Sequence, residues 1–355
     1  DELTISEVSE ADLGLYRLVV SNGYGSTIVP VNITEGGTPS FWSGGAWQLP
    51  IGFISEPDAI ANPAAAVNKV IVPNRDRRLI YSENYNQNVD LEGCDCVISS
   101  GSVVTIPSGK TLTLYGDITV EPKVVITDVV DPSITVTIPA GIITIEDNAS
   151  LVQTKPVTTN SNSGAIIMQR EASNLHVNDY VYWSSPVANF NISGISNTPT
   201  FQWNVNAINA NGSNGNWISA SNSTMETARG YIVRVPNATT FTTNFIGRPN
   251  NGRIREMVYK TSVTQAANDR HWNLIGNPYP SAISANDFLS ANSRIDGNVR
   301  IWMHNNPLAT VPNPSDTPFY QNFAYNYGDQ YVTHNGTGST PFGLFDGNIA
   351  AGQAF

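Results

Sequence analysis

The chain has 355 residues, and 18 Lys and Arg against 29 Asp and Glu give a formal net charge of −11 at pH 7. Nucleic acids and anionic membranes bind clustered Lys and Arg, so this charge argues against both as partners. No apolar run approaches the roughly 20 residues that span a bilayer. The length exceeds one ordinary domain, so we expect several units.

The composition predicts an all-β fold. Only 13% of residues are charged, and Asn, Ser, Thr and Gly supply the polarity, as in short strands joined by turns. We expect a partial immunoglobulin-like sandwich, a β-solenoid-like region, and an antiparallel β-sandwich that is jelly-roll-like with one short helix. The predicted units are the end of an immunoglobulin-like domain at 1–36, a linker or cap at 37–68, the solenoid-like repeat region at 69–158 and the sandwich module at 164–355.

Residues 1–36 match the last third of an immunoglobulin-like domain. A strand is predicted at 3–8, and Asp12-Leu-Gly-Leu-Tyr16 has the pattern of a tyrosine corner. Two strands then flank a hairpin at residues 23–25. Because the chain opens within this pattern, we expect it to be a piece of a longer protein.

The next stretch places Trp42 and Trp47 around a glycine turn. Two interpretations stay open, a stacking platform for a sugar and a cross-strand aromatic pair that closes the end of the following unit. Residues 54–68 are predicted to be irregular, since Pro57 and Pro63 oppose a helix.

An internal repeat lies within 69–153. A Val-Thr-Ile-Pro motif occurs at residues 104–107 and again at 136–139, 32 residues later. Short apolar strands separated by Pro and Gly corners are typical of a β-solenoid, whose turns bury aliphatic side chains and need covers at both ends. An ordinary sandwich with repeated hairpins is the alternative.

The two cysteines, Cys94 and Cys96, are candidates for a local disulfide. In a strand, residues i and i+2 have Cα atoms roughly 6.5–7 Å apart, at the limit for a bridge, although a bent turn could close it. Reduced buried thiols and metal or redox chemistry are the alternatives.

The sandwich module contains a predicted corner at residues 271–281. A half-buried strand at 272–275 meets Gly276 and Asn277, and Pro278 and Pro280 then take the backbone out of the sheet. A short helix follows, with a start at Ser284-Ala-Asn-Asp287 that resembles a capping box. The other predicted strands are 165–170, 179–186, 230–235, 241–246, 299–302 and 342–345.

No catalytic motif is recognisable, and we predict no enzyme and no cofactor. The four histidines, His176, His271, His304 and His334, are scattered in the sequence. Trp203, Trp217 and Trp302 are candidates for a sugar-stacking surface, with core packing as the alternative. Turns at 296–298 and 346–348 could contribute oxygen ligands to calcium.

Motifs in a fixed order run through residues 40–355. They are 94–96, 106–110, 180–187, 225–232, 272–280, 295–297, 301–304 and 349–355. They resemble a module common in very large secreted proteins of Bacteroidota, especially flavobacteria, which typically precedes a C-terminal type IX secretion sorting domain. The resemblance implies export to the outside or the outer cell surface of a Gram-negative bacterium.

Many proteins of that class are adhesins or parts of the surface machinery for gliding motility, and others are hydrolases that carry the module as an accessory. We therefore expect a non-catalytic structural or adhesive segment of a large cell-surface protein or filament. Its partners would be other modules of the same long chain, surface polysaccharide or other copies of itself. The alternative is an accessory carbohydrate-binding module of a secreted polysaccharide hydrolase.

Overall fold

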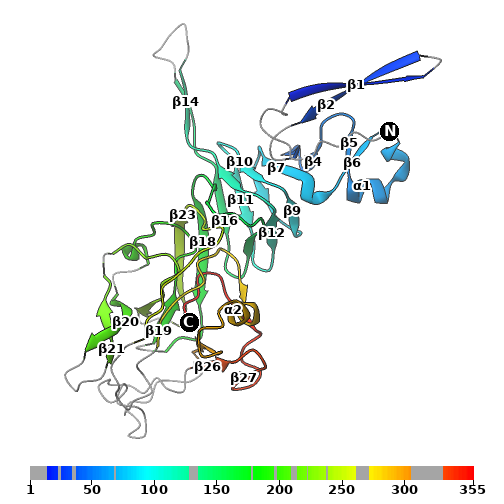
Figure 1. Ribbon diagram of the computed structural model, residues 1–355. Coiled ribbons are helices and arrows are strands. Elements are labelled where there is room, and N and C mark those ends of the chain that lie inside the picture. The colour runs from blue at the N-terminus through cyan, green and yellow to red at the C-terminus, as the bar shows by residue number, and fades with distance from the viewer. Residues whose placement is uncertain are drawn as a thin grey trace.

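The structure is a computed structural model (Figure 1). It describes residues 14–22, 25–33, 37–67, 69–127, 135–176, 179–195, 198–208, 214–221, 223–236, 239–260, 272–304 and 331–355. Strands dominate these residues, which confirms the predicted all-β fold, and two short α-helices accompany them, α1 (Glu56–Ala61) and α2 (Ala285–Ala291). None of the helices in the described ranges is long and apolar enough to span a membrane.

Residues 77–153 form what we call the three-sheet unit, in which the chain visits three sheets in turn and repeats the circuit. The first sheet contains β7 (Arg77–Tyr81), β10 (Cys96–Ile98) and β13 (Ile118–Val120). The second contains β8 (Tyr85–Asn86), β11 (Val103–Ile106) and β16 (Ile142–Ile145). The third contains β9 (Leu91–Gly93), β12 (Thr111–Leu114) and β17 (Ser150–Gln153). Every pairing among these strands is parallel.

The parallel registers stack similar side chains in columns. Leu112 pairs with Leu91 on one side and Leu151 on the other, and Val104 lies between Tyr85 and Ile143 in the second sheet. All six are at most 9% exposed. Since side chains alternate across a strand, the aliphatic side chains of each circuit can point inward while its Thr and Ser side chains point outward.

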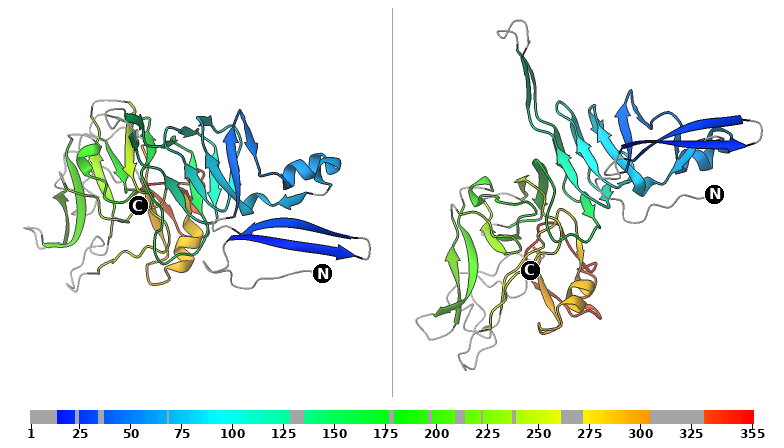
Figure 2. Two further views of the ribbon diagram at one scale, coloured as in Figure 1. Left: turned by 90° about the horizontal axis from the view of Figure 1, so that it is seen from above. Right: turned by 45° about the horizontal axis from the view of Figure 1, so that its top comes forward.

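A hairpin of β14 (Val124–Thr127) and β15 (Thr135–Ile138) is inserted between β13 and β16 and projects from the body (Figures 1 and 2). This insertion corrects the predicted repeat. Ile106 pairs with Ile145, whereas Ile138 pairs with Val124 inside the hairpin. Each Val-Thr-Ile-Pro motif ends a strand immediately before its proline. The two strands do not occupy equivalent positions in the fold.

Two strands of the first sheet, β10 and β13, each follow an aspartate, Asp95 and Asp117, and these two aspartates are neighbours in space. The Asp117 backbone N–H donates to Asp95 Oδ1 at 2.8 Å. Burial, and then the negative charge of Asp95, raise the pKa of the Asp117 carboxyl above its ordinary value, while Lys155 acts in the opposite direction. One oxygen of this carboxyl is buried without a hydrogen-bond donor among the described residues.

We therefore predict that Asp117→Asn stabilises the chain at pH 7. The side chain is only half-buried, so the expected gain is only about 0.5 kcal/mol. Because the folded-state pKa is raised, the charged form weakens the fold above that pKa, and protonation removes this penalty as the pH falls through it. Thermal unfolding at pH 7 and at pH 4 should show the gain shrinking. An equal gain at both values would contradict the assignment.

Both ends of the three-sheet unit are covered. At one end β3 (Thr38–Ser43) pairs with β7 and forms a hairpin with β4 (Ala46–Gln48), where Trp42 and Trp47 meet edge to face at 5.6 Å. The predicted aromatic pair is thus confirmed. At the other end Asn162 Oδ1 accepts a hydrogen bond from the Ile118 N–H at 3.0 Å, which occupies a donor on the outer edge of β13.

The prediction that residues 54–68 are irregular is wrong in part, because α1 occupies 56–61. Ser55 caps this helix by accepting from the Asp58 N–H, and Pro57 lies in the first turn, where a missing N–H costs nothing. The neighbouring strands β5 (Phe53–Ser55) and β6 (Val70–Val72) pair in parallel.

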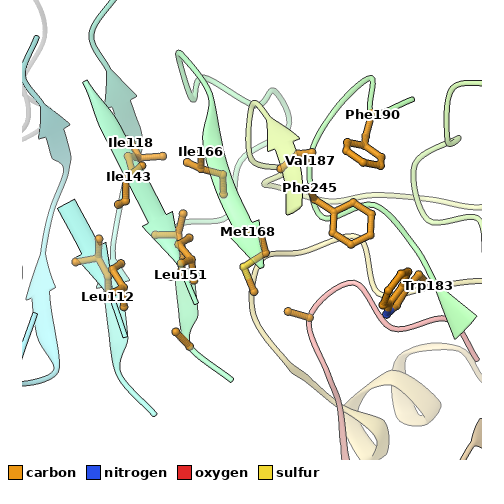
Figure 3. Packing of buried hydrophobic residues seen from close by; sticks show 14 of the residues in the cluster. Leu112, Ile118, Ile143, Leu151, Ile166, Met168, Trp183, Val187, Phe190 and Phe245 are labelled. Carbon is orange, nitrogen blue, oxygen red and sulfur yellow. The ribbon is translucent and has the colours of Figure 1, made fainter. Parts of the chain in front are cut away.

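The second sheet continues past residues 159–163, which separate the two predicted units. Its strand β16 pairs in parallel with β18 (Ile166–Ala172), which pairs antiparallel with β23 (Phe241–Gly247). An antiparallel sheet faces this pair, with the order β19 (Tyr180–Trp183), β22 (Tyr231–Arg234), β20 (Thr200–Ile208) and β21 (Asn214–Ser219). One hydrophobic cluster runs from Leu112 through Met168 to Trp183 and Phe245 (Figure 3). The two regions therefore share a core.

The remaining strands are short. They are β24 (Ile283–Ser284), β25 (Val299–Trp302), β26 (Tyr331–His334), β27 (Ser339–Thr340) and β28 (Asn348–Ile349). Two predicted strands are absent: 342–345 is a turn, and 272–275 makes only single bridges, at Ile275 and the following Gly276. Both stretches are apolar enough to resemble strands but lack a continuous partner.

Near the N-terminus, β1 (Gly14–Asn22) and β2 (Gly25–Ile33) form the antiparallel hairpin predicted around residues 23–25. The strand predicted at 3–8 and the first two residues of the tyrosine-corner motif, Asp12 and Leu13, lie outside the described residues. The immunoglobulin-like assignment and the jelly-roll-like connectivity stay predictions.

Candidate functional site

A pocket of about 440 Å³ lies where the three-sheet unit meets the corner that follows residue 275. We call it the corner pocket. Its walls come from β17 and the residues just after it, the loop after β23, and residues 279–283. A hydrogen bond from the Leu151 N–H to the Pro280 carbonyl, at 2.8 Å, fixes the first wall to the third.

Asn277 holds the corner rigid. Its side chain is fully buried, and its Nδ2 donates to the carbonyls of Ser281 (2.7 Å), Ile349 (3.1 Å) and Ala350 (3.0 Å). Its Oδ1 accepts from the Tyr279 N–H at 3.0 Å. One amide side chain thus binds three backbone carbonyls and ties the corner to the segment at residues 349–350.

Gly276 allows this close packing. A Cβ at this position would come within 2.1 Å of the Ser184 Cβ, so no larger residue fits without movement. The Gly276 N–H also donates to the Ala228 carbonyl at 2.9 Å. The corner is therefore pressed against the start of the antiparallel sheet.

The loop after β23 forms the second wall. Asn250 is buried, and its Nδ2 donates to the carbonyls of Ser185 (3.2 Å) and Pro278 (3.0 Å). Gly252 has a φ of 80°, and a Cβ there would come within 2.7 Å of the Val157 carbonyl oxygen, which makes glycine the residue that fits.

Tyr279 joins the loop to the corner. Its hydroxyl donates to the Gly252 carbonyl at 2.7 Å. Burial raises the pKa of this phenol, so at neutral pH it keeps the proton that makes this bond. The half-buried ring forms part of the pocket lining.

The pocket presents donors and cations. Asn251 is 9% exposed, and its Nδ2 has no hydrogen-bond partner in the described part of the chain. Lys155 and Arg253 contribute to different walls, and none of the described lining residues is acidic. The arrangement can hold an anion or a polar ring, and it offers no carboxylate for acid–base chemistry.

A second polar cluster surrounds Asp179, whose side chain is 1% exposed. The Nδ1 atoms of His176 and His304 lie 3.4 and 3.5 Å from its Oδ2, which accepts from the His176 N–H at 2.7 Å. Their positions in the sequence, 128 residues apart, do not indicate that these two histidines meet. His334 lies elsewhere, bound to Ser339 and Asn286, and His271 lies outside the described residues.

The three tryptophans proposed for sugar stacking do not form one open surface. Trp203 is 9% exposed and donates from Nε1 to the Trp272 carbonyl at 2.8 Å. Trp302 is 4% exposed and stacks on Tyr182 at 4.8 Å. Only Trp217 is half-buried; it meets Trp203 edge to face at 5.1 Å. Core packing accounts for Trp203 and Trp302, and Trp217 alone keeps an accessible ring.

Cys94 and Cys96 are not joined by a disulfide, contrary to the candidate bridge. Cys96 is buried in the first sheet between Leu79 and Ile118. Cys94 lies in the preceding turn with its sulfur against Gly37, where an added Cβ would come within 2.5 Å of it. The two thiols thus have separate environments.

Both thiols should react slowly in the folded chain. Burial, followed by the nearby Asp95, raises the pKa of Cys94 to about 11 and raises that of Cys96 further. At pH 8 about one Cys94 in a thousand would be thiolate, the reactive form. We predict alkylation by iodoacetamide about a hundredfold slower than in denatured chain, measured by mass spectrometry. Rapid labelling of Cys94 in the folded chain would contradict this environment.

The two turns considered for calcium are turns in the structure. Gly297 and Gly347 have φ values of 73° and 94°, and the Asn348 N–H donates to Asp346 Oδ1 at 2.8 Å. Across the described ranges, no group of three or more His, Cys, Asp or Glu is placed to hold a metal ion. Calcium binding stays an untested prediction.

Sequence reasoning identified the corner but missed the pocket. The loop at residues 249–252, Pro-Asn-Asn-Gly, had no assigned role, and the residues after β17 were assigned only to the end of the repeat region. The one available signal was the concentration of Asn, Pro and Gly in both 249–252 and 276–280, which marks tight turns without showing that they meet.

A family model described as a domain of unknown function (DUF8693) matches residues 60–355. No curated protein and no solved structure matches the chain. The matched span contains the three-sheet unit, the facing antiparallel sheets and the corner pocket.

Proposed function

We propose a function from the geometry of this chain, which belongs to the DUF8693 family, a domain of unknown function. The chain would be a non-catalytic structural or adhesive segment of a large bacterial cell-surface protein or filament, exported by type IX secretion. The observation that supports this best is the sheet that runs from β8 through β11, β16 and β18 to β23. It joins the three-sheet unit to the antiparallel sheets through one core, as a stiff spacer requires.

The three-sheet unit acts, in this proposal, as a short β-solenoid. Its parallel registers and its aliphatic columns support that interpretation. The β3–β4 hairpin and the residues around Asn162 cover its two ends, so the segment could extend a surface protein without exposing sheet edges to neighbours.

Labelling of cells tests this role. Antibodies against residues 38–355 should label intact, unpermeabilised cells of the native source, and electron microscopy with gold-labelled antibody should place the chain on surface filaments. The purified chain should release no new reducing ends from polysaccharides. Labelling only after permeabilisation, or turnover of a polysaccharide, would refute the proposal.

A second candidate is an accessory carbohydrate-binding module, favoured by the polar, ring-lined corner pocket. A glycan array with the purified chain tests it. Loss of binding in Trp217→Ala would place the sugar on that accessible ring. Unchanged binding by this variant would place the sugar in the corner pocket. Absence of binding to every glycan would remove this candidate and leave the first.

A further inference from the structure

We propose that the corner pocket binds an acidic sugar, with the carboxylate of a uronate residue held by Asn251 and Arg253. The inference rests on the second of the two functions above, and it names the class of glycan. The argument depends on the charge of the pocket, on a buried donor without a partner, and on the shape of the lining.

The charge of the pocket is opposite to that of the chain. Lys155 and Arg253 face it from different walls, and none of its described lining residues is acidic, although the formal net charge of the whole chain is −11. Fields of exposed charges fade over about 8 Å at physiological salt, so two nearby cations outweigh distant carboxylates. Lys155 also interacts electrostatically with the Asp117 carboxyl. Arg253 is therefore the stronger candidate to bind an anion.

Asn251 supplies a donor that the protein does not use. Its Oδ1 accepts from the Gly252 N–H at 2.7 Å, which fixes the amide, while its Nδ2 is buried without a partner in the described residues. An unsatisfied buried donor costs about 1–3 kcal/mol. A carboxylate oxygen in the pocket would satisfy it.

The backbone argues against a peptide terminus or a phosphate, which are commonly bound by clusters of main-chain N–H groups. Here three of these groups are already occupied. The N–H of Gly252 donates to Asn251, that of Arg253 to the Val157 carbonyl, and that of Tyr279 to Asn277. The donor of the lining that is buried without a partner in the described residues, Asn251 Nδ2, belongs to a side chain.

The lining suits a sugar ring. The half-buried ring of Tyr279 and the pyrrolidines of Pro156 and Pro280 give flat apolar surface, and Thr158 and Ser281 add hydroxyls. The volume of about 440 Å³ lies within the usual range for small-molecule sites. A carboxylated pyranose combines a flat face, hydroxyls and one negative charge.

Titration calorimetry of the whole chain with a galacturonate trimer tests the inference. The methyl ester of the same trimer is the matched ligand, since it keeps the rings and removes the charges. We expect binding of the acid, weaker as salt rises, and at least about tenfold weaker binding of the ester, the size of one charge-assisted contact.

Three variants locate the site. Arg253→Gln should weaken the acid about tenfold, and Asn251→Asp should abolish binding, because it keeps the Oδ1 acceptor and replaces the donor with a negative oxygen. Arg255→Gln, an exposed position outside the pocket, is the control and should change nothing. Unchanged melting temperatures would show that the variants fold.

Several results would overturn the inference. They are no binding of the acid, equal binding of acid and ester, unchanged affinity in Arg253→Gln, and displacement by millimolar inorganic phosphate, which would indicate a general anion site. Binding of neutral glycans that is lost in Asn251→Asp would overturn the uronate assignment while keeping the carbohydrate-binding function.

Discussion

Replacing Asn277 with aspartate should destabilise the folded chain by about 4 kcal/mol or more at pH 7. The substitution preserves shape and changes two hydrogen-bond donors into an acceptor. Asn277 Nδ2 faces three carbonyl oxygens within 3.1 Å, and a carboxylate there would have only the Tyr279 N–H to bind. An uncompensated buried charge costs about 3–5 kcal/mol.

The loss should depend on pH. The pKa of the new carboxyl would be raised in the folded state by burial and by the surrounding carbonyls, so the protonated acid can again donate one hydrogen bond. Stability of Asn277→Asp should therefore recover in part as the pH falls from 7 to 4, in contrast to Asn277→Ala. The alanine variant should lose about 3 kcal/mol at both values, since it leaves buried carbonyls unpaired.

Asn335 offers a matched control. It is exposed, and its Oδ1 accepts from the N–H groups of Thr337 and Gly338. Asn335→Asp keeps those bonds and should shift the melting temperature little. Thermal unfolding followed by circular dichroism measures all three variants. A melting temperature of Asn277→Asp within about 1 °C of the parent at pH 7 would show that the corner does not hold this part of the fold.

Local chemistry in the sequence predicted local structure well. Ser284 caps α2 by accepting from the Asp287 N–H, as its spacing indicates, and the two tryptophans around a glycine turn pair as expected. The two prolines at 278 and 280 do end strand pairing. Each of these features is decided within a few residues, so neighbours in the sequence are sufficient to specify it.

Features set by distant contacts could not be predicted in the same way. The inserted β14–β15 hairpin carries a copy of the Val-Thr-Ile-Pro motif, so sequence similarity gave the wrong register for the circuit. The corner pocket joins residues near 155, 251 and 280, and Asp179 meets His304. Nothing in the separate segments shows that they converge, because tertiary packing brings them together.

Replacing Asp147 with asparagine should destabilise the folded chain by weakening the contact between the three-sheet unit and β18. Asp147, in the turn between β16 and β17, pairs with Arg170 on β18 at 2.5 Å, and the two side chains are 25% and 12% exposed. Burial lowers the pKa of Arg170, and Asp147 opposes that shift. The guanidinium stays protonated, so it depends on this carboxylate to compensate its charge.

Without the carboxylate, a nearly buried cation remains unpaired, and we expect a loss of about 2–4 kcal/mol. Arg170→Met should cost less, because the partly exposed Asp147 can turn to water and still accept from the Glu171 N–H, now at 3.0 Å. The double variant Asp147→Leu, Arg170→Met should be close to the parent or more stable, since well-packed apolar pairs often replace buried ion pairs without cost.

Urea unfolding of the parent, Asp147→Leu, Arg170→Met and the double variant gives the coupling energy, because these four proteins form a double-mutant cycle. If the ion pair joins the units, Asp147→Asn should also expose the β16–β18 junction to faster amide hydrogen exchange, with the β9–β12 pairing unaffected. Additive effects of Asp147→Leu and Arg170→Met in the double variant would mean that each side chain acts alone. The sheet hydrogen bonds and the shared core would then hold the two regions together without the charges.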